Sequence, residues 1–202
     1  MIGRRLLLAG LALAPGLAQA ADAEAAAPIA ALNQALMASM KAGTTAPFPQ
    51  RYARLLPVVD RAFDIPATLQ AAVGPRWSGL PPAQQAQLLD VFRKFTVARY
   101  VDNFDGFNGE ALELLPETRS VGADQVVATR ITPAGGEPVR IDYVMRQGSQ
   151  GWRAVDVLLN GSISQVAVQR SDFRALVSAG DAGPLIANLQ RKVSELSGGT
   201  MG

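Results

Sequence analysis

Hydrophobic residues recur at helical spacing in the first part of the chain. Residues 22–46 form an alanine-rich stretch with apolar positions three and four apart, which predicts a helix. A second helix is expected over about 48–62, because its apolar residues follow the same spacing. Pro57 lies inside this second segment and predicts a kink, since proline removes a helical hydrogen bond.

Two further helices are marked by their ends. Asp64 is a suitable N-cap for a short helix that stops at Gly74-Pro75. Pro81-Pro82 then opens a longer helix over about 82–104, because proline fits the first helical turn. One arc of the long helix is apolar, so this arc is expected to face the interior.

The pattern changes to strands after residue 110. Segments 125–132, 138–146 and 152–159 are rich in Val, Ile, Tyr and Thr, and glycine-rich turns separate them. Segment 110–121 is a candidate fourth strand. Short turns join antiparallel neighbours, so the strands predict a meander. Alternation along the middle strand places Val139, Ile141, Tyr143 and Met145 on one face and Arg140, Asp142 and Arg146 on the other.

The chain is expected to end in two helices. Ser162 with Gln165 resembles a capping box for a helix that Gly180 and Gly183 terminate. A last helix is expected over 184–196, followed by a flexible tail, 197–202. The order of elements predicts one α+β domain over residues 21–196, with an antiparallel sheet of about four strands wrapped by several helices.

The first 20 residues have the features of a secretory signal peptide. Arg4 and Arg5 precede an apolar run from Leu6 to Leu17, and Ala18-Gln19-Ala20 fits a cleavage site. The apolar run is too short to span a bilayer. We therefore expect an exported protein, most simply a periplasmic one, whose mature form begins at Ala21.

Composition excludes several kinds of chemistry. The 202 residues include no His and no Cys, which rules out a Ser-His-Asp triad, a thiolate nucleophile and His- or Cys-ligated metal sites. Of the 19 basic residues, two lie in the leader, and the rest equal the 17 acidic ones in number. This balance argues against nucleic-acid binding. We expect no cofactor, no metal and no catalytic residues, and a binding protein more readily than an enzyme.

One arginine has an unusual place in the pattern. Arg170 lies at the centre of the apolar stripe formed by Ile163, Val166, Phe173 and Val177. A buried guanidinium needs a partner because its desolvation is costly. Asp156 in the last strand is the nearest acidic candidate, and a structural Arg170–Asp156 pair is the interpretation we favour. The alternative is that Arg170, or Arg99 on its own apolar arc, faces an anionic headgroup.

The order of short motifs resembles the MlaC, or toluene-tolerance, family of periplasmic lipid carriers. The resemblance covers about residues 28–196. Its motifs begin with the segment from Arg54 to Phe63-Asp64, and further motifs carry it. They are Val73-Gly74-Pro75-Arg76-Trp77, Phe92-x-x-Phe95, Phe107-Asn108-Gly109, Trp152-Arg153-Ala154-Val155-Asp156-Val157, Asn160-Gly161-Ser162 and Arg170-Ser171-Asp172-Phe173. Segment 162–171 is closest to the hopanoid-associated HpnM branch, and Gln169 stands where the family usually has an aromatic residue.

The resemblance implies an NTF2-like fold around an apolar cavity that holds the acyl chains of a lipid. The implied ligand is a phospholipid or a hopanoid. The implied partners are an inner-membrane ABC-type lipid transporter complex and an outer-membrane lipoprotein complex, with transient contact to membrane surfaces. Residues expected at the cavity are Phe63, Leu89, Phe92, Phe95, Tyr100, Ile141, Tyr143, Met145, Val155, Val157, Ile163, Val166, Phe173 and Val177.

Two other functions compete with the lipid carrier. The first is an NTF2-like enzyme with an Asp base that acts on a small apolar substrate. The second is a non-catalytic periplasmic adaptor whose interior is filled by its own side chains. An aromatic stripe such as Phe92, Phe95, Tyr100 and Phe104 is more often core than cavity wall.

Overall fold

The computed structural model describes residues 15–201, and side chains from residue 22 onwards. Most of the expected signal peptide therefore lies outside the described residues. Within the described part, six α-helices and two short 3₁₀ helices accompany five strands. The helices are α1 (Pro15–Ala42), η1 (Gly43–Thr45), α2 (Phe48–Ala62), α3 (Ile65–Val73), η2 (Gly74–Gly79), α4 (Pro82–Asn103), α5 (Gln165–Phe173) and α6 (Gly183–Leu196).

The predicted ends of α3 and α4 are confirmed. The Asp64 side chain accepts a hydrogen bond from the Ala67 amide at 3.0 Å, so it is the N-cap of α3. Gly74 follows α3 with φ +71°, a conformation that favours glycine and ends the helix. Helix α4 begins at Pro82, as the paired prolines indicated.

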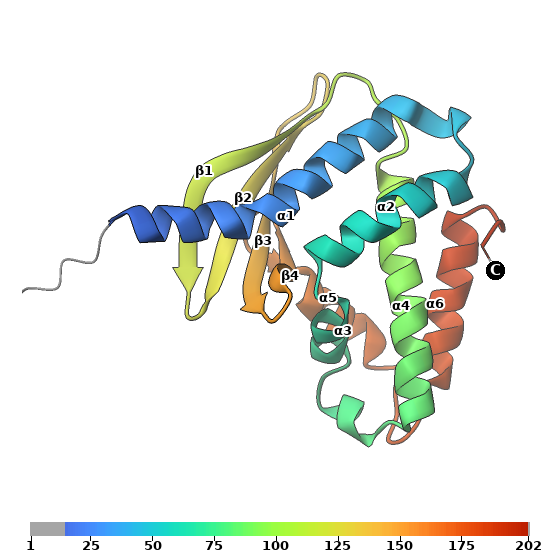
Figure 1. Ribbon diagram of the computed structural model, residues 1–202. Helices are drawn as coiled ribbons and strands as arrows, with labels where there is room; N and C mark the ends of the chain where they lie inside the picture. Colours follow the sequence, from blue (N-terminus) through green and yellow to red (C-terminus); the bar gives the residue numbers. More distant parts are fainter. Residues whose placement is uncertain (1–14, 202) are drawn as a thin grey trace, which may run out of the picture.

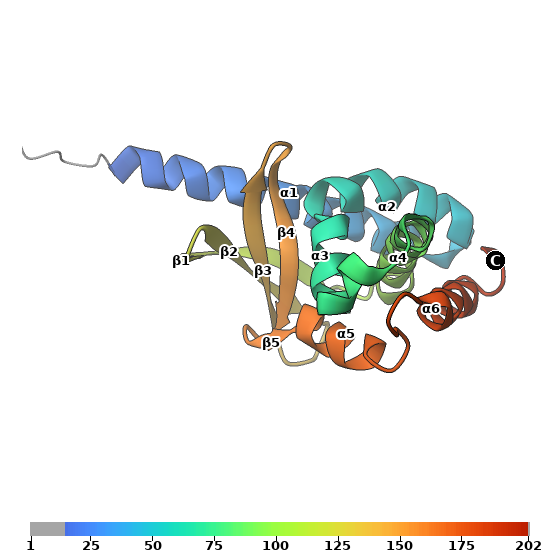
Figure 2. The same ribbon diagram turned by 90° about the horizontal axis from the view of Figure 1, so that it is seen from below.

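The strands form one antiparallel sheet in the order β1-β2-β3-β4-β5. Their bounds are β1 (Ala111–Val121), β2 (Asp124–Thr132), β3 (Val139–Gly148), β4 (Gly151–Leu159) and β5 (Ile163–Ser164). The α+β class is confirmed, and the helices gathered beside the sheet fit the NTF2-like arrangement (Figures 1 and 2). The candidate fourth strand is β1, while β5 was not predicted.

A bulge in β4 changes which side chains share a face. Tyr143 pairs with Val157 and Met145 pairs with Ala154, so Val155 is the extra residue between the two pairs. Simple alternation would place Val155 and Val157 on the same face. The bulge separates them, and only Val157 stays beside Tyr143.

The helix after the sheet begins later than the capping box suggested. Ser164, not Ser162, accepts a hydrogen bond from the Ala167 amide at 3.0 Å and caps α5. The reason is that Ile163 and Ser164 first pair with β4. Helix α5 ends at Phe173, so Val177 lies in the following loop rather than on the same helix.

Side chains from the inner face of the sheet and from the helices pack together in one hydrophobic core. Figure 1 shows α1 crossing the sheet and α4 running beside α6. Ile29, Leu32 and Leu36 on α1 are buried in the same cluster as Tyr143 and Met145 of β3. The core is thus continuous from the sheet to the helices, and the elements predicted from the sequence pack around it.

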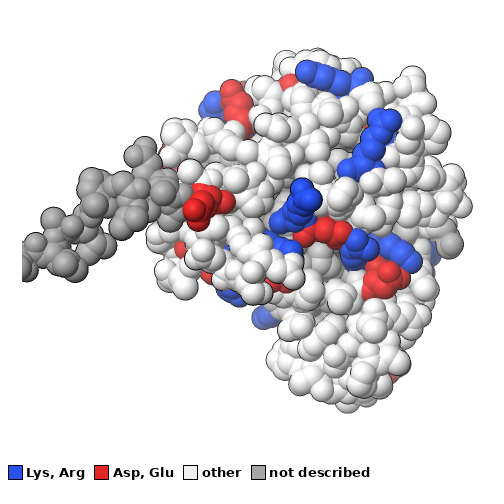
Figure 3. Space-filling view, viewed as in Figure 1, with Lys and Arg blue, Asp and Glu red and all other residues white. Residues whose placement is uncertain are grey.

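Charged side chains cover the outer face of the sheet. Asp142 is only 1% exposed because Arg140 donates to it at 2.9 Å and Arg119 lies within 3.5 Å. Arg140 also forms an ion pair with Glu117 of β1, with 2.9 Å between the nitrogen and the oxygen. In Figure 3, basic and acidic side chains are interspersed on the face shown, without a large patch of one sign.

Candidate functional site

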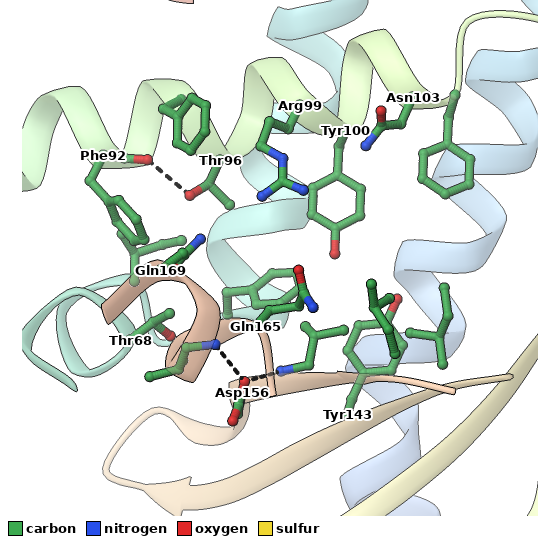
Figure 4. A pocket seen from close by; sticks show the side chains of 18 residues that line it. Thr68, Phe92, Thr96, Arg99, Tyr100, Asn103, Tyr143, Asp156, Gln165 and Gln169 are labelled. Carbon is green, nitrogen blue, oxygen red and sulfur yellow. Dashed lines mark hydrogen bonds between the residues drawn. The ribbon is translucent and has the colours of Figure 1, made fainter. Parts of the chain in front are cut away.

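A cavity of about 290 Å³ lies between the inner face of the sheet and helices α3, α4 and α5. Its volume is near the lower end of the roughly 300–1,000 Å³ usual for small-molecule sites. Figure 4 shows α4 on one side of it and α5 with the ends of the strands on the other. The lining residues are Phe63, Ile65, Thr68, Phe92, Phe95, Thr96, Arg99, Tyr100, Asn103, Phe104, Ile141, Tyr143, Asp156, Val157, Leu159, Gln165, Val166 and Gln169.

Aromatic rings make up much of the wall. Phe63 lies 5.6 Å from Tyr100 and 6.1 Å from Tyr143, measured between ring centroids, and Tyr100 stacks on Phe104 at 6.0 Å. The backbone fixes Phe63 in place, because the next residue, Asp64, donates its amide hydrogen to the Ala154 carbonyl at 2.9 Å. The junction between α2 and α3 is therefore attached to β4, and the rings are presented together.

The two cavity tyrosines stay uncharged at ordinary pH. Burial raises the pKa of Tyr143 to about 12 from its usual 10.0. Burial also raises the pKa of Tyr100 well above 10.0, and the neighbouring Tyr143 hydroxyl adds to the effect. Both phenols are therefore neutral hydroxyl groups on an otherwise largely apolar wall.

Asp156 organises the start of α5. Its Oδ1 accepts from the amides of Val157 at 2.7 Å and Val166 at 3.1 Å, and its Oδ2 accepts from Ser164 Oγ at 2.5 Å. These bonds join the end of β4 to the first turn of α5 (Figure 4). A carboxylate at a helix N-terminus is also favoured by the helix dipole. The three donors give Asp156 a complete structural role.

Arg170 does not reach Asp156. Its guanidinium donates through Nε at 2.9 Å and through one terminal nitrogen at 2.6 Å to the carbonyl of Ala71, near the C-terminus of α3. In the described residues no ion pair joins it to Asp156. Arg170 is exposed, and its guanidinium contacts α3 rather than the sheet.

A second arginine joins the same two helices in the opposite direction, from the end of α3 to the end of α5. Arg76, in η2 directly after α3, donates to the carbonyls of Arg174 and Val177 at and beyond the end of α5. We call the contacts of Arg76 and Arg170 the arginine clasp. The clasp joins α3 and α5, which together form one wall of the cavity. Figure 2 shows these two helices beside each other.

The structure brings many of the residues predicted for the site to the cavity. Those that line it are Phe63, Phe92, Phe95, Tyr100, Ile141, Tyr143, Val157 and Val166, together with Arg99 and Asp156. Leu89, Met145, Val155, Ile163, Phe173, Val177 and Arg170 are not among the lining residues.

Packing explains most of these differences. Met145 is fully buried in the core, and Phe173 packs edge-on against Phe92 at 6.2 Å. Val177 is buried in the loop after α5, and the bulge removes Val155 from the cavity face. Ile163 is 50% exposed in β5. Leu89 is partly buried against the core, one turn before the part of α4 that borders the cavity.

Sequence patterns missed several lining residues, among them the amide and threonine side chains of the wall. The lining residues not predicted for the site are Ile65, Thr68, Thr96, Asn103, Phe104, Leu159, Gln165 and Gln169. Gln165, Val166 and Gln169 have the spacing of one helical face, and this signal could have placed both glutamines beside Val166. The expected helix start at Ser162 and the emphasis on apolar positions obscured it.

We also searched the described residues for a metal site and for membrane-spanning helices. No cluster of three or more acidic side chains in it could hold a metal ion. The helices between residues 15 and 201 include none with the length and hydropathy of a membrane span.

A helix-covered antiparallel sheet around a mostly apolar cavity defines a small-ligand-binding α+β domain. The model of the MlaC protein family matches residues 30–191, and the chain belongs to this family. The chain is also similar in fold to a solved structure, the phospholipid-binding protein from Ralstonia solanacearum in complex with a phospholipid. The two have a TM-score of 0.69 and 24% sequence identity, and the match covers 86% of this chain and 99% of the other.

Proposed function

We propose that this protein binds a phospholipid in the cavity and carries it through the periplasm. The observation that carries the proposal is the cavity itself, an aromatic pocket with neutral tyrosines in a member of the MlaC family. The phospholipid complex of the Ralstonia protein, which shares the fold, supports a lipid as the ligand.

The energetics of lipid transfer require burial of the acyl chain. Exposing a chain of about 16 carbons to water costs roughly 13 kcal/mol at ~0.8 kcal/mol per CH₂. A carrier must therefore enclose most of the chain, so that the lipid has a similar free energy in the protein and in the bilayer. The buried rings of Phe63, Phe92 and Tyr143 supply a suitable apolar surface.

The carrier role includes partners. We propose that an inner-membrane ABC-type lipid transporter complex and an outer-membrane lipoprotein complex exchange lipid with this protein, with transient contact to the membrane surface. The leader at residues 1–20 supports export to the periplasm. A hopanoid is the second candidate ligand, because segment 162–171 resembles the HpnM branch.

The enzyme and adaptor alternatives are less well supported. Asp156 is the carboxylate at the cavity, and three donors already occupy its oxygens, so it is poorly placed to act as a general base. An adaptor filled by its own side chains would have no need of a cavity of about 290 Å³.

Blocking the cavity tests the proposal. Val157→Trp fills the space beside Tyr143, and we expect it to abolish lipid uptake from vesicles while the fold is kept. Val139→Trp is the matched control, because Val139 lies in the neighbouring strand, is 40% exposed and does not line the cavity. If Val157→Trp loads as much lipid as the wild type, the cavity is not the lipid site.

A further inference from the structure

The polar side chains of the cavity are concentrated on two facing helices. Arg99 and Asn103 come from α4, and Gln165 and Gln169 come from α5 (Figure 4). Asn103 is exposed and the other three are partly buried, whereas apolar rings such as Phe92 are buried. The cavity therefore has a polar, solvent-accessible side and an apolar interior, which is the polarity of an amphiphilic ligand.

Arg99 is the cation of the cavity. Its Cζ lies 5.7 Å from the centre of the Phe95 ring, one turn earlier on α4, and this contact holds the guanidinium at the wall. None of the ion pairs in the described residues involves Arg99. Its donors are suited to a bidentate contact with a phosphate or carboxylate.

Among the described residues, no group that lines the cavity neutralises this charge. Asp156 directs its oxygens to the start of α5, where three donors bind them. Tyr100 and Tyr143 are the other ionisable groups that line the cavity, and their raised pKa values keep them neutral. The cavity thus has one cation and a carboxylate that is already bound elsewhere.

Gln169 supplies a second, independent observation that points to a ligand. Its Oε1 atom is buried and has no hydrogen-bond partner. A buried polar atom without a partner costs free energy, so a ligand atom is the expected partner. Phosphate oxygens need a donor, and rotation about the last side-chain bond exchanges the amide oxygen with the N–H groups, so an N–H of Gln169 can take the place of Oε1 and donate to the ligand.

We propose that Arg99 and Gln169 bind the phosphate group of the lipid at the polar side of the cavity, with the acyl portion among the aromatic rings. This inference rests on the proposed function and goes beyond it by assigning the headgroup site. It commits the ligand to a phosphate-bearing lipid and not to an uncharged one. Asn103 and Gln165 border the same site and offer further amide donors.

Two lipids with the same acyl chains test the assignment. Delipidated protein is loaded from vesicles that contain equal amounts of phosphatidylglycerol and diacylglycerol, which lacks the phosphate, and bound lipid is measured by mass spectrometry. We expect the wild type to favour phosphatidylglycerol by about tenfold, the effect of one good charge-assisted contact. Arg99→Gln should bring this ratio close to one, and Gln169→Leu should lower it by a smaller factor.

Controls separate headgroup recognition from loss of the fold. Arg54→Gln removes an exposed arginine of α2 that does not line the cavity, and it should keep the wild-type ratio. Arg99→Lys should keep part of the preference, since a cation remains. The melting temperature of each variant is measured alongside, and an Arg99→Gln protein with an unchanged ratio would overturn the assignment whatever its stability.

The remaining outcomes distinguish the two proposals. If the wild type takes up neither lipid, the proposed carrier function itself fails. If it takes up both equally, the carrier function stands and the headgroup site is wrong. The last experiment measures the binding of inorganic phosphate alone by calorimetry. Tight binding that depends on Arg99 would show that the site takes a free anion instead of a lipid headgroup.

Discussion

Single residues illustrate which contacts sequence patterns reveal and which they do not. Asp64 was recognisable as a cap because the cap and its helix are adjacent in the chain. Arg170 was not assigned correctly, since its partner is a backbone carbonyl of Ala71, and a carbonyl leaves no mark in the sequence. Patterns therefore identify local partners, while contacts to distant backbone need the structure.

Asp156 provides a prediction at the same scale. Asp156→Ala removes the acceptor for two amides and one hydroxyl, and we expect the free energy of unfolding to fall by about 1–3 kcal/mol. Chemical denaturation measures the change. Asp172→Ala, an exposed position on α5, is the control and should change stability by less than about 0.5 kcal/mol. An equal effect of both substitutions would contradict the capping role.

Tyr143 predicts how stability responds to alkaline pH. Its pKa is about 12 in the folded protein against the usual 10.0, so the unfolded chain releases the proton first. The stability contributed by the neutral phenol is therefore complete below pH 10 and is lost between pH 10 and 12. Between pH 10 and 12, the free energy of unfolding of Tyr143→Phe should fall by about 2–3 kcal/mol less than that of the wild type. Parallel pH profiles of the two proteins would refute this.

At the scale of elements, the predicted helices and strands agree well with the structure where their ends carry a signal. The long α4 and the three hairpin-linked strands have clear periodicity and turn residues. The bulge at Val155 and the short β5 have no such signal, because both result from pairing between strands. Those two features account for Val155 and Ile163, which do not line the cavity.

The arginine clasp predicts how α5 moves. Arg170→Met removes bonds to the Ala71 carbonyl of α3, and Arg76→Met removes bonds to carbonyls just after the end of α5, so α5 should open more readily. We expect hydrogen exchange of α5 amides to rise about tenfold and the stability to fall by about 1 kcal/mol. Arg174→Met leaves the clasp intact, because only the carbonyl of Arg174 takes part. Exchange that rises equally in this control would show that the clasp does not hold α5.

The described part of the molecule is an α+β domain that encloses a cavity, and we propose that residues 1–20 are a removable leader. Helix α1 buries side chains from Ala25 onwards in the core, which is beyond the expected cleavage point. Removal of residues 1–20 should therefore leave the domain folded. We expect N-terminal sequencing of the exported protein to begin at Ala21. A sequence that begins at Met1 would remove the basis for a periplasmic location.

Sequence patterns could predict the class of fold and the aromatic helix of the site, but not the empty space. A stripe such as Phe92, Phe95, Tyr100 and Phe104 has the same pattern whether it faces a packed core or a cavity. The difference depends on how closely α3 and α5 approach the sheet. The clasp joins these two helices through residues about 100 positions apart, so periodicity along the sequence cannot reveal it.

The lipid content of the protein as purified tests the central claim most directly. The mature protein is produced by export, extracted with organic solvent, and the extract is quantified by mass spectrometry. We predict about one phospholipid per protein molecule, and much less in Val157→Trp. The lipid-carrier function would be contradicted by folded protein that contains no lipid as purified and still takes up none after incubation with phospholipid vesicles.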